Sequence, residues 1–247
     1  MNRLDYIHRT HPRAKRLSVK IDQAGKVVVV TPRFTPGWLI KKFVTDNQEW
    51  IAAHQQKLSS SRSALLDTPS TLLLFGKKYQ AHVRYLAQQA PGVYTQADQL
   101  VINPFDPKTN SLKDCSQQLT RFLKKSARRY IEPQSLQLAE KMSLNVSKIQ
   151  FRAQKSRWGS CSHTGTLSFN WRLVHCPVEI INYVVIHELA HLVHFDHSRA
   201  FWTLVAQHDP AYQQNRGWLK KHGGVILSLQ DSLIITNQNQ QSAILTS

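Results

Sequence analysis

The stretch HELAHLVHFDH, residues 187–197, decides the fold because it carries a metal-binding pattern. In an α-helix four residues advance about 400° and about 6 Å, so His187 and His191 project from one face on successive turns and can share one cation. Glu188 lies about 100° round the helix from His187, beside the metal, where a general base for water must stand. The pattern predicts a helix that holds a metal ion and a catalytic carboxylate.

A third ligand is predicted at His197, six residues after His191. This separation is too long for the same helical face, so the chain has to turn after about Phe195 and bring His197 back. Three neutral imidazoles and one open position are typical of a catalytic zinc site, with one ion per chain. Two alternatives remain open: His194 replaces His197 as the ligand, or a His-rich helix packs in a core without metal.

The residues on either side of the motif predict two helices. Ile180, Tyr183 and Val184 lie at helical spacing from the two histidines, and Pro177 is in a position typical of a first turn. After the motif, apolar residues again recur at helical spacing. We therefore expect His197 on the first turn of a second helix, which is pinned by Phe201 and Trp202 and capped by one of two residues, Asp196 or Ser198.

Length and composition are those of a globular protein with 247 residues, 41% of them hydrophobic. Such a chain can bury the core of one large domain or two small ones. The sequence has no apolar run of the ~18 residues needed to cross a bilayer, and no signal-peptide pattern. We expect a cytoplasmic protein with no membrane partner.

Cysteine usage agrees with a reducing compartment. Cys115, Cys161 and Cys176 are an odd number, widely spaced and without a CxxC pair, so neither a disulfide framework nor a zinc ribbon is indicated. Cys161 could replace a histidine ligand, although a small, partly buried residue is the favoured interpretation.

The formal net charge of +17 and the pI near 10.1 indicate anionic partners, which include nucleic acid, a nucleotide or an acidic protein. The basic residues form two clusters in the sequence. The first falls in a predicted helix and consists of Arg121, Lys124, Lys125, Arg128 and Arg129. The second lies just before the metal helix and consists of Arg152, Lys155 and Arg157. Base-stacking aromatics are not interleaved with the first cluster, so sequence-specific nucleic-acid recognition is not supported.

The first 110 residues are predicted to be rich in β-strand. Segments 15–21 and 26–31 read as a hairpin with its turn at 22–25, residues 36–58 as one amphipathic helix, and residues 59–70 as a linker. Four further strands are expected between residues 72 and 102, arranged as a small meander.

The second part, residues 111–224, is predicted to be the metallohydrolase core. A long helix is expected over 112–142, kinked or divided at Pro133. Segments 149–152, 156–161 and 166–172 are expected to form a small sheet, with residues 163–165 as the turn of the last pair. Residues 225–247 are a C-terminal extension, either a strand pair or a frayed tail. The fold class is α+β.

Three groups of residues carry a family resemblance: RWGSC at 157–161, NWRL at 170–173, and YVVIHELAH at 183–191 with the residues that follow it. The chain resembles the YgjP-like (DUF45) metallopeptidase family, which is related in design to SprT-like and WLM-type zinc proteases. The resemblance implies a minimal zincin-like core, with a metal-binding helix beside a small sheet. It implies His187, His191 and His197 as zinc ligands and Glu188 as the base.

A substrate-binding region is expected on the sheet beside the metal helix. Zincins hold substrate as an added strand along the edge of such a sheet. Trp158, Gly159 and Ser160 are the candidates for this rim, with Gly159 permitting close backbone approach. The alternative is that Trp158 packs in the core and Gly159 is a bulge.

The leading functional hypothesis is a zinc-dependent hydrolase, most simply a peptidase. One alternative is a metal-dependent nucleotide or phosphoanhydride hydrolase resembling a nucleoside triphosphate pyrophosphatase, in which the basic residues 152, 155 and 157 neutralise charge. A second alternative is a DNA-associated protein whose zinc site is mainly structural. The residue that assists the oxyanion is left open among four candidates, Tyr183, Tyr212, Arg172 and His222.

Overall fold

The computed structural model describes residues 5–21, 26–66, 70–105, 112–154 and 156–229. Together they form a mixed structure of helices and small sheets, which confirms the predicted α+β class. The chain divides into two compact units, Met1–Leu65 and Leu66–Ser247, and all the predicted metal ligands belong to the second unit. Among the described residues, no helix is both long and apolar enough to cross a membrane.

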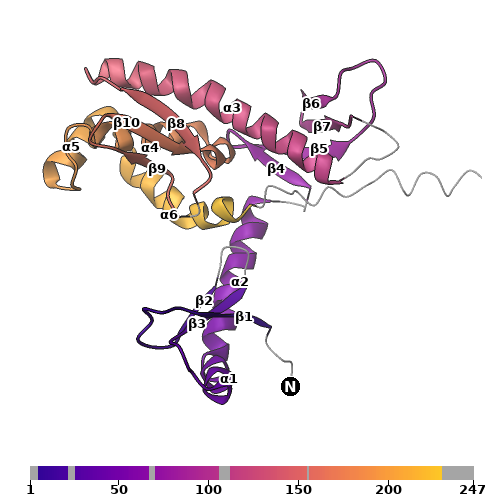
Figure 1. Cartoon of the computed structure of the whole chain (residues 1–247). Coiled ribbons are helices and arrows are strands. Elements are labelled where there is room, and N and C mark those ends of the chain that lie inside the picture. Colours follow the sequence, from indigo (N-terminus) through magenta and orange to yellow (C-terminus); the bar gives the residue numbers. More distant parts are fainter. Residues whose placement is uncertain (1–4, 22–25, 67–69, 106–111, 155, 230–247) are drawn as a thin grey trace, which may run out of the picture. The chain divides into compact units, whose positions relative to one another are not determined.

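The first unit contains a three-stranded sheet with the order β1-β3-β2 (Figure 1). β2 (Ser18–Ile21) and β3 (Val27–Thr31) pair antiparallel, which confirms the predicted hairpin, while its turn at 22–25 lies outside the described residues. β1 (Tyr6–Thr10), which the sequence analysis did not anticipate, pairs parallel with β3. The central strand β3 therefore has a partner on both sides.

The prediction of one helix over 36–58 was wrong. The boundary between the two units, at Leu65 and Leu66, lies within the predicted linker over 59–70, of which residues 67–69 lie outside the described residues. The structure has two helices, α1 (Gly37–Asp46) and α2 (Gln48–Leu65), separated at Asn47. Asn47 ends α1 because its side-chain amide donates to the Phe43 carbonyl, which competes with continued helix. The serine-rich stretch that begins at residue 59 did not end α2, because a serine hydroxyl can donate to a carbonyl within the helix. The hydroxyl of Ser60 donates in this way to the Gln56 carbonyl.

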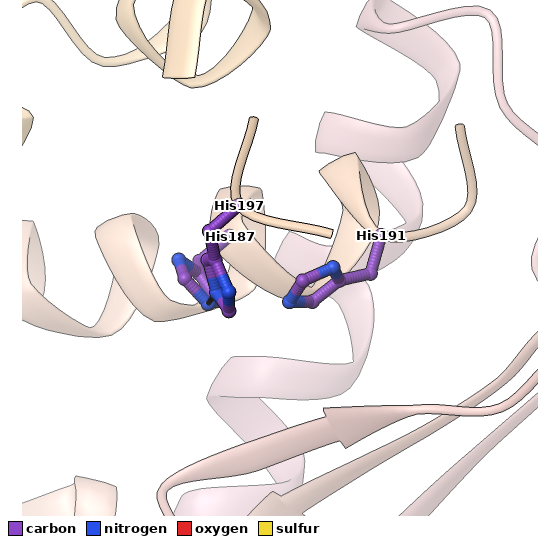
Figure 2. Close-up of side chains that lie close together, drawn as sticks. All are labelled: His187, His191 and His197. Atoms are coloured by element: carbon purple, nitrogen blue, oxygen red, sulfur yellow. Dashed lines mark hydrogen bonds between the residues drawn. The ribbon is translucent and has the colours of Figure 1, made fainter. Parts of the chain in front are cut away.

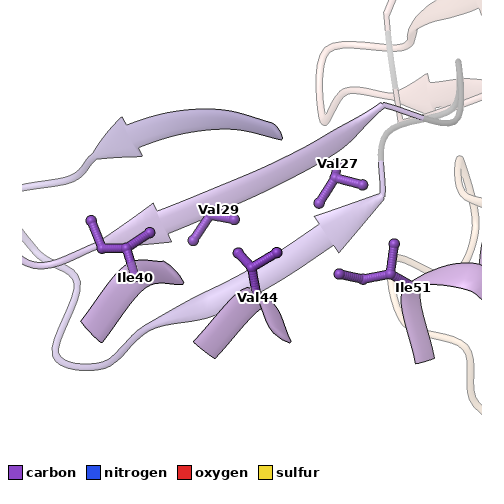
Figure 3. Close-up of a cluster of buried hydrophobic side chains, with 5 residues drawn as sticks. All are labelled: Val27, Val29, Ile40, Val44 and Ile51. Atoms are coloured by element: carbon purple, nitrogen blue, oxygen red, sulfur yellow. The ribbon is translucent and has the colours of Figure 1, made fainter. Parts of the chain in front are cut away.

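The core of the first unit lies between its sheet and its helices (Figure 3). The alternation of β3 places Val27 and Val29 on one face, and helical spacing places Ile40 and Val44 on the facing side of α1. Ile51 of α2 completes the cluster and is fully buried. This unit thus has an apolar core of its own.

The second unit begins with a four-stranded sheet. It comprises β4 (Thr71–Leu74), β5 (Lys77–Val83), β6 (Gly92–Gln96) and β7 (Gln99–Asn103). The four strands are where the sequence predicts them, but the expected meander was wrong. The order is β4-β5-β7-β6, because β5 pairs parallel with β7 and leaves β6 at the edge. These strands also belong to the same compact unit as the predicted metal ligands rather than to the N-terminal unit.

The turn between β4 and β5 supports the start of the metal helix. Phe75 and Gly76 both have positive φ, as a tight hairpin turn requires, and the Phe75 N–H donates to the Val174 carbonyl at 2.7 Å. A Cβ added at Gly76 would lie 2.9 Å from the Pro177 Cα. Glycine at this position therefore lets the turn approach the residue that precedes the helix.

The long helix α3 (Leu112–Lys141; Figure 1) packs against η1 (Trp171–His175) and α4 (Val178–Ala190). The prediction that Pro133 divides it was wrong, because the helix continues through that residue. Pro133 is exposed, as is Arg129 four residues earlier, whose carbonyl proline leaves without its helical donor.

The second sheet of this unit has the order β8-β10-β9. β10 (Thr166–Asn170) is central, parallel to β8 (Lys148–Arg152) and antiparallel to β9 (Gly159–Cys161). This confirms the predicted three-stranded sheet, although the middle segment begins at Gly159 instead of Ser156. Gly165 of the predicted turn has positive φ, and its N–H donates to the Ser162 carbonyl.

Four helical segments complete the second unit: η1 (Trp171–His175), α4 (Val178–Ala190), α5 (Arg199–His208) and α6 (Tyr212–Ser228). α4 contacts α3, α5, α6 and β9, so it lies at the centre of this unit. The predicted extension from residue 225 begins too early, because α6 runs on to Ser228 and buries Val225 and Ile226. Residues 230–247 of the predicted extension lie outside the described residues.

Candidate metal centre

α4 places two histidines at its C-terminal end. The helix begins after Pro177, as predicted, and most of its residues are buried, since it packs against neighbours on several sides. It ends at Ala190 with His191 as the C-cap, so His187 lies one turn before the cap. The chain then turns, and the N–H groups of Val193 and His194 donate to the Ala190 carbonyl.

His197 comes from the loop between α4 and α5. We expected His197 on the first turn of α5, but it lies immediately before the N-cap, Ser198. The Ser198 hydroxyl accepts from the Phe201 N–H at 3.4 Å, and the Asp196 carboxylate accepts from the Ser198 N–H at 3.2 Å. Both predicted capping candidates therefore fix the backbone beside His197, which sets the direction of its side chain.

The three histidines converge at one point (Figure 2). Their nearest ring nitrogens all lie within 4.8 Å of one another, and the Nε2 atoms of His187 and His197 are 3.2 Å apart. Two nitrogens on a tetrahedral zinc ion would be separated by about 3.3 Å. The observed separations thus fit a shared cation with small side-chain adjustments.

His194 has a different position from the one that a ligand requires. Among the described residues, the group that could hold a metal contains neither His194 nor Cys161. Instead, the His194 carbonyl lies 2.9 Å from Nδ1 of His191. A proton on that Nδ1 leaves the Nε2 lone pair of His191 free for a metal, a support that is common for metal-binding histidines.

The three histidines pack against aromatic side chains. The ring of Phe201, which is fully buried, lies 4.6–4.9 Å from all three imidazole rings, and Trp202 stacks on His197 at 5.7 Å. Burial, together with the charges of the neighbouring histidines, lowers the pKa of His187 to about 3. Burial also lowers the pKa of His197. Both rings are therefore held in the neutral form that binds a metal.

Glu188 is buried beside the cluster. Burial raises the pKa of its carboxyl to about 8, against the opposing effect of Arg157. A Cβ added at Gly159 would lie 2.5 Å from Oε1 of Glu188. The absence of a side chain at Gly159 thus makes room for the Glu188 carboxyl, which is a different role from the predicted close approach of a substrate.

A cavity of about 220 Å³ opens onto this carboxyl. Of the residues predicted to bind substrate, three line it: Arg157, Trp158 and Gly159. Ser160 is half-buried within β9, and Lys155 lies outside the described residues. Arg152 is exposed at the end of β8, bonds to Gln150 and does not line the cavity.

Asn170 holds the loop that brings Arg157 and Trp158 to the cavity. Its side-chain amide donates to the carbonyls of Gln154 and Arg157, and its backbone N–H donates to the Trp158 carbonyl at 2.7 Å. Asn170 was predicted only as part of the family pattern. Its role depends on the parallel pairing of β8 with β10, which local sequence does not reveal.

Among the four candidates for assisting the oxyanion, only Tyr183 lines the metal cavity. Burial raises the pKa of Tyr183 to about 12, so its hydroxyl keeps its proton near neutral pH. Arg172 is directed elsewhere, over the Trp171 ring and toward the Leu229 carbonyl. The ring of His222 lies against Trp218.

The sequence analysis missed Arg216, on α6. Its guanidinium lies 4.8 Å from the Trp202 ring, and its charge helps to lower the pKa values of His187 and His197. Trp202 also stacks on Tyr212, four residues before Arg216. The four-residue spacing was a signal for a shared helical face, but only the packing of α6 on α4 brings that face near the metal ligands.

The basic cluster of α3 does not line the metal cavity. All five of its residues are exposed. Two of them contact aromatic rings: Lys124 lies 5.7 Å from the Trp171 ring centre, and Arg128 lies 5.6 Å from that of Phe151. Arg128 also pairs with Glu132 at 3.4 Å. Part of this cluster therefore packs against the surface of its own unit.

Three histidines gathered beside a buried glutamate, on an α+β fold, define a metal-dependent hydrolase as the class of protein. Residues 15–222 match a family model described as YgjP-like, metallopeptidase domain, and the chain belongs to the YgjP-like family. No curated protein matches the sequence. A solved structure, the metallopeptidase zymogen of Pyrococcus abyssi abylysin, is 22% identical, and the match covers 37% of this chain and 93% of that one with a TM-score of 0.34.

Proposed function

We propose that the protein is a zinc-dependent peptidase in which Glu188 is the general base. The observation that carries the proposal is the buried Glu188 carboxyl, which shares one cavity with the ligand His187. Three imidazole nitrogens suit zinc, whereas magnesium and calcium prefer oxygen ligands. His187, His191 and His197 would hold the ion, and no fourth protein ligand is present in the described group.

The proposed reaction is hydrolysis of a peptide bond. When bound, zinc would supply an acidified water molecule and a positive charge for the substrate carbonyl. Glu188 accepts a proton as the water oxygen bonds to the carbonyl carbon, and it donates that proton to the amine nitrogen as the C–N bond breaks. Arg157 favours the ionised form of Glu188 that starts this cycle.

We propose that the peptide substrate lies along β9. Among the described residues this strand pairs only with β10, so we assign the main-chain hydrogen bonds of the peptide to its other edge. β9 begins at Gly159, next to Glu188, and Trp158 immediately before it lines the same cavity. A peptide added at this edge would bring its main chain to the base.

The test compares the wild type with Glu188→Gln on unfolded protein, nucleotides and DNA. We expect peptide cleavage by the wild type and a loss of about 10⁴-fold or more in the variant, since the base and the metal act as a unit. Metal analysis should find one zinc ion per chain in both proteins and none in His187→Ala. Phosphate or pyrophosphate release without peptide cleavage would establish the nucleotide hydrolase instead. Unchanged function of Glu188→Gln would indicate a structural zinc site in a DNA-associated protein.

We also propose a cytoplasmic location and nucleic acid as a further partner. Among the described residues, Cys115, Cys161 and Cys176 form no disulfide, and two of them are buried, which suits a reducing compartment. Nucleic-acid association is supported by the net charge of +17 and by the exposed cluster on α3.

A further inference from the structure

A groove of about 660 Å³ adjoins the metal cavity. The two share Trp158 and Leu219 in their linings, so they are neighbouring hollows of the same surface. The rest of the described groove lining comes from α6, including Tyr212, Arg216 and Lys220. The lining contains two cations and no carboxylate, which makes the groove positively charged.

Arg216 is held in place by stacked rings. Its guanidinium lies over Trp202, which stacks on Tyr212 at 5.4 Å and on His197 at 5.7 Å. Such an arginine is oriented before a ligand arrives, and less rotamer entropy is lost when it binds an anion. Lys220 follows Arg216 by four residues and therefore lies one turn further along the same face of α6.

The two linings separate the role of Arg216 from catalysis. His187 and Glu188 line the metal cavity without Arg216, whereas the groove includes Arg216 but no metal ligand. A group bound by Arg216 is thus a neighbour of the scissile bond, not the scissile carbonyl itself.

We propose that Arg216 and Lys220 form a subsite that binds an acidic side chain of the peptide, close to the scissile bond. The inference rests on the proposed peptidase function. A bidentate pair between a guanidinium and a carboxylate is the strongest contact that this groove offers. A peptide is favoured over a nucleotide because the groove continues from Trp158, next to the open edge of β9, and because its helical lining contains no glycine-rich phosphate loop.

The test uses two sets of fluorogenic peptides that differ only in Asp and Glu versus Asn and Gln beside the scissile bond. We expect the wild type to prefer the acidic set by about tenfold in kcat/KM. Arg216→Gln should bring the ratio close to one, and Lys220→Gln should lower it less. Lys221→Gln removes a charge from an exposed residue of the same helix that does not line the groove, and should leave the ratio unchanged. Arg216→Glu should favour peptides with Lys at that position.

The outcomes separate this inference from the proposed function. Equal cleavage of both sets overturns the subsite and leaves the peptidase intact, whereas cleavage of neither set overturns the peptidase. A binding measurement does not depend on turnover: zinc-loaded Glu188→Gln should bind a labelled acidic peptide more tightly than its neutral counterpart, and Arg216→Gln in that background should remove the difference. A different result would assign the groove to phosphate. In that case a nucleoside triphosphate displaces the acidic peptide, and the wild type hydrolyses the nucleotide but cleaves no peptide.

Discussion

At the scale of single residues, the site depends on one close contact between a glycine and a carboxyl. Gly159 leaves the space that Glu188 fills, and Glu188 in turn borders the cavity with His187. This contact joins the two parts of the family pattern, RWGSC and HELAH, which are 28 residues apart when counted from Gly159 to His187. The glycine of the first motif and the glutamate of the second are therefore matched to each other sterically.

The contact predicts that Gly159→Ala lowers activity without loss of metal. The added methyl would lie 2.5–2.7 Å from three atoms of Glu188, so the carboxyl must move. A displacement of about 1 Å at a catalytic group can cost about 10²-fold in rate. Kinetics and metal analysis check this result, with Gly224→Ala as the control, because a Cβ at that position meets nothing within 4 Å. Full activity of Gly159→Ala would contradict the role given to the contact.

Burial of Glu188 also predicts a pH-dependent stability in the metal-free protein. The carboxyl ionises near its ordinary value of 4.5 in the unfolded chain but keeps its proton to about pH 8 in the folded protein. The folded state thus binds more protons between these values, so stability falls as pH rises. Between pH 6.5 and 8 this loss amounts to about 2 kcal/mol. The pKa of His187 is lowered from its ordinary value of 6.5 to about 3, so its titration changes the stability little between pH 6.5 and 8.

Denaturant unfolding of chelator-treated protein at pH 6.5 and pH 8 measures this effect. Glu188→Gln has no carboxyl to ionise, so the variant should be less sensitive to pH than the wild type. If the free energies of unfolding of the two proteins change equally with pH, burial of the Glu188 carboxyl does not cause the pH dependence.

At the scale of elements, the site is assembled from two helix ends and a strand edge. α4 supplies His187 and His191 at its C-terminal end, the loop before α5 supplies His197, and β9 lies against Glu188. The Ser198 cap determines where α5 begins and therefore where His197 is placed.

We predict that Ser198→Ala weakens metal binding as well as the helix. Loss of an N-cap costs about 1 kcal/mol, and here it also loosens the backbone next to a ligand. Zinc titration against a competing chelator should show a several-fold weaker affinity. Ser198→Asn should restore it, because asparagine is an equally good cap. Thr203→Ala is the control, since Thr203 is an exposed residue of the same helix. An unchanged affinity of Ser198→Ala would remove the link between cap and ligand.

At the scale of the whole molecule, the chain has two compact units, and one of them holds all three histidines of the candidate metal centre. The first unit has a core of its own around Val29 and Ile51. The basic groove, the metal cavity and the open edge of β9 all belong to the second.

This division predicts that Ile51→Ala destabilises the first unit by about 2–5 kcal/mol, because a fully buried side chain is removed, and leaves zinc affinity unchanged. Conversely, chelation of zinc should destabilise the second unit, since a metal that binds only the folded state stabilises it by mass action. Hydrogen exchange of peptides from each unit measures the two effects separately. A change in zinc affinity in Ile51→Ala would show that the first unit supports the site.

The sequence by itself determined the α+β class, most strands, the metal helix and the spacing of His187, Glu188 and His191, because these follow from local periodicity and turn residues. It failed at Asn47, where a side-chain hydrogen bond decided the outcome. His197 was also predicted as the third ligand, but only the tertiary structure placed it before the N-cap of α5, Gly159 against Glu188, and Arg216 in the lining of the groove. These contacts join residues on different elements, and their geometry depends on packing that no local pattern encodes.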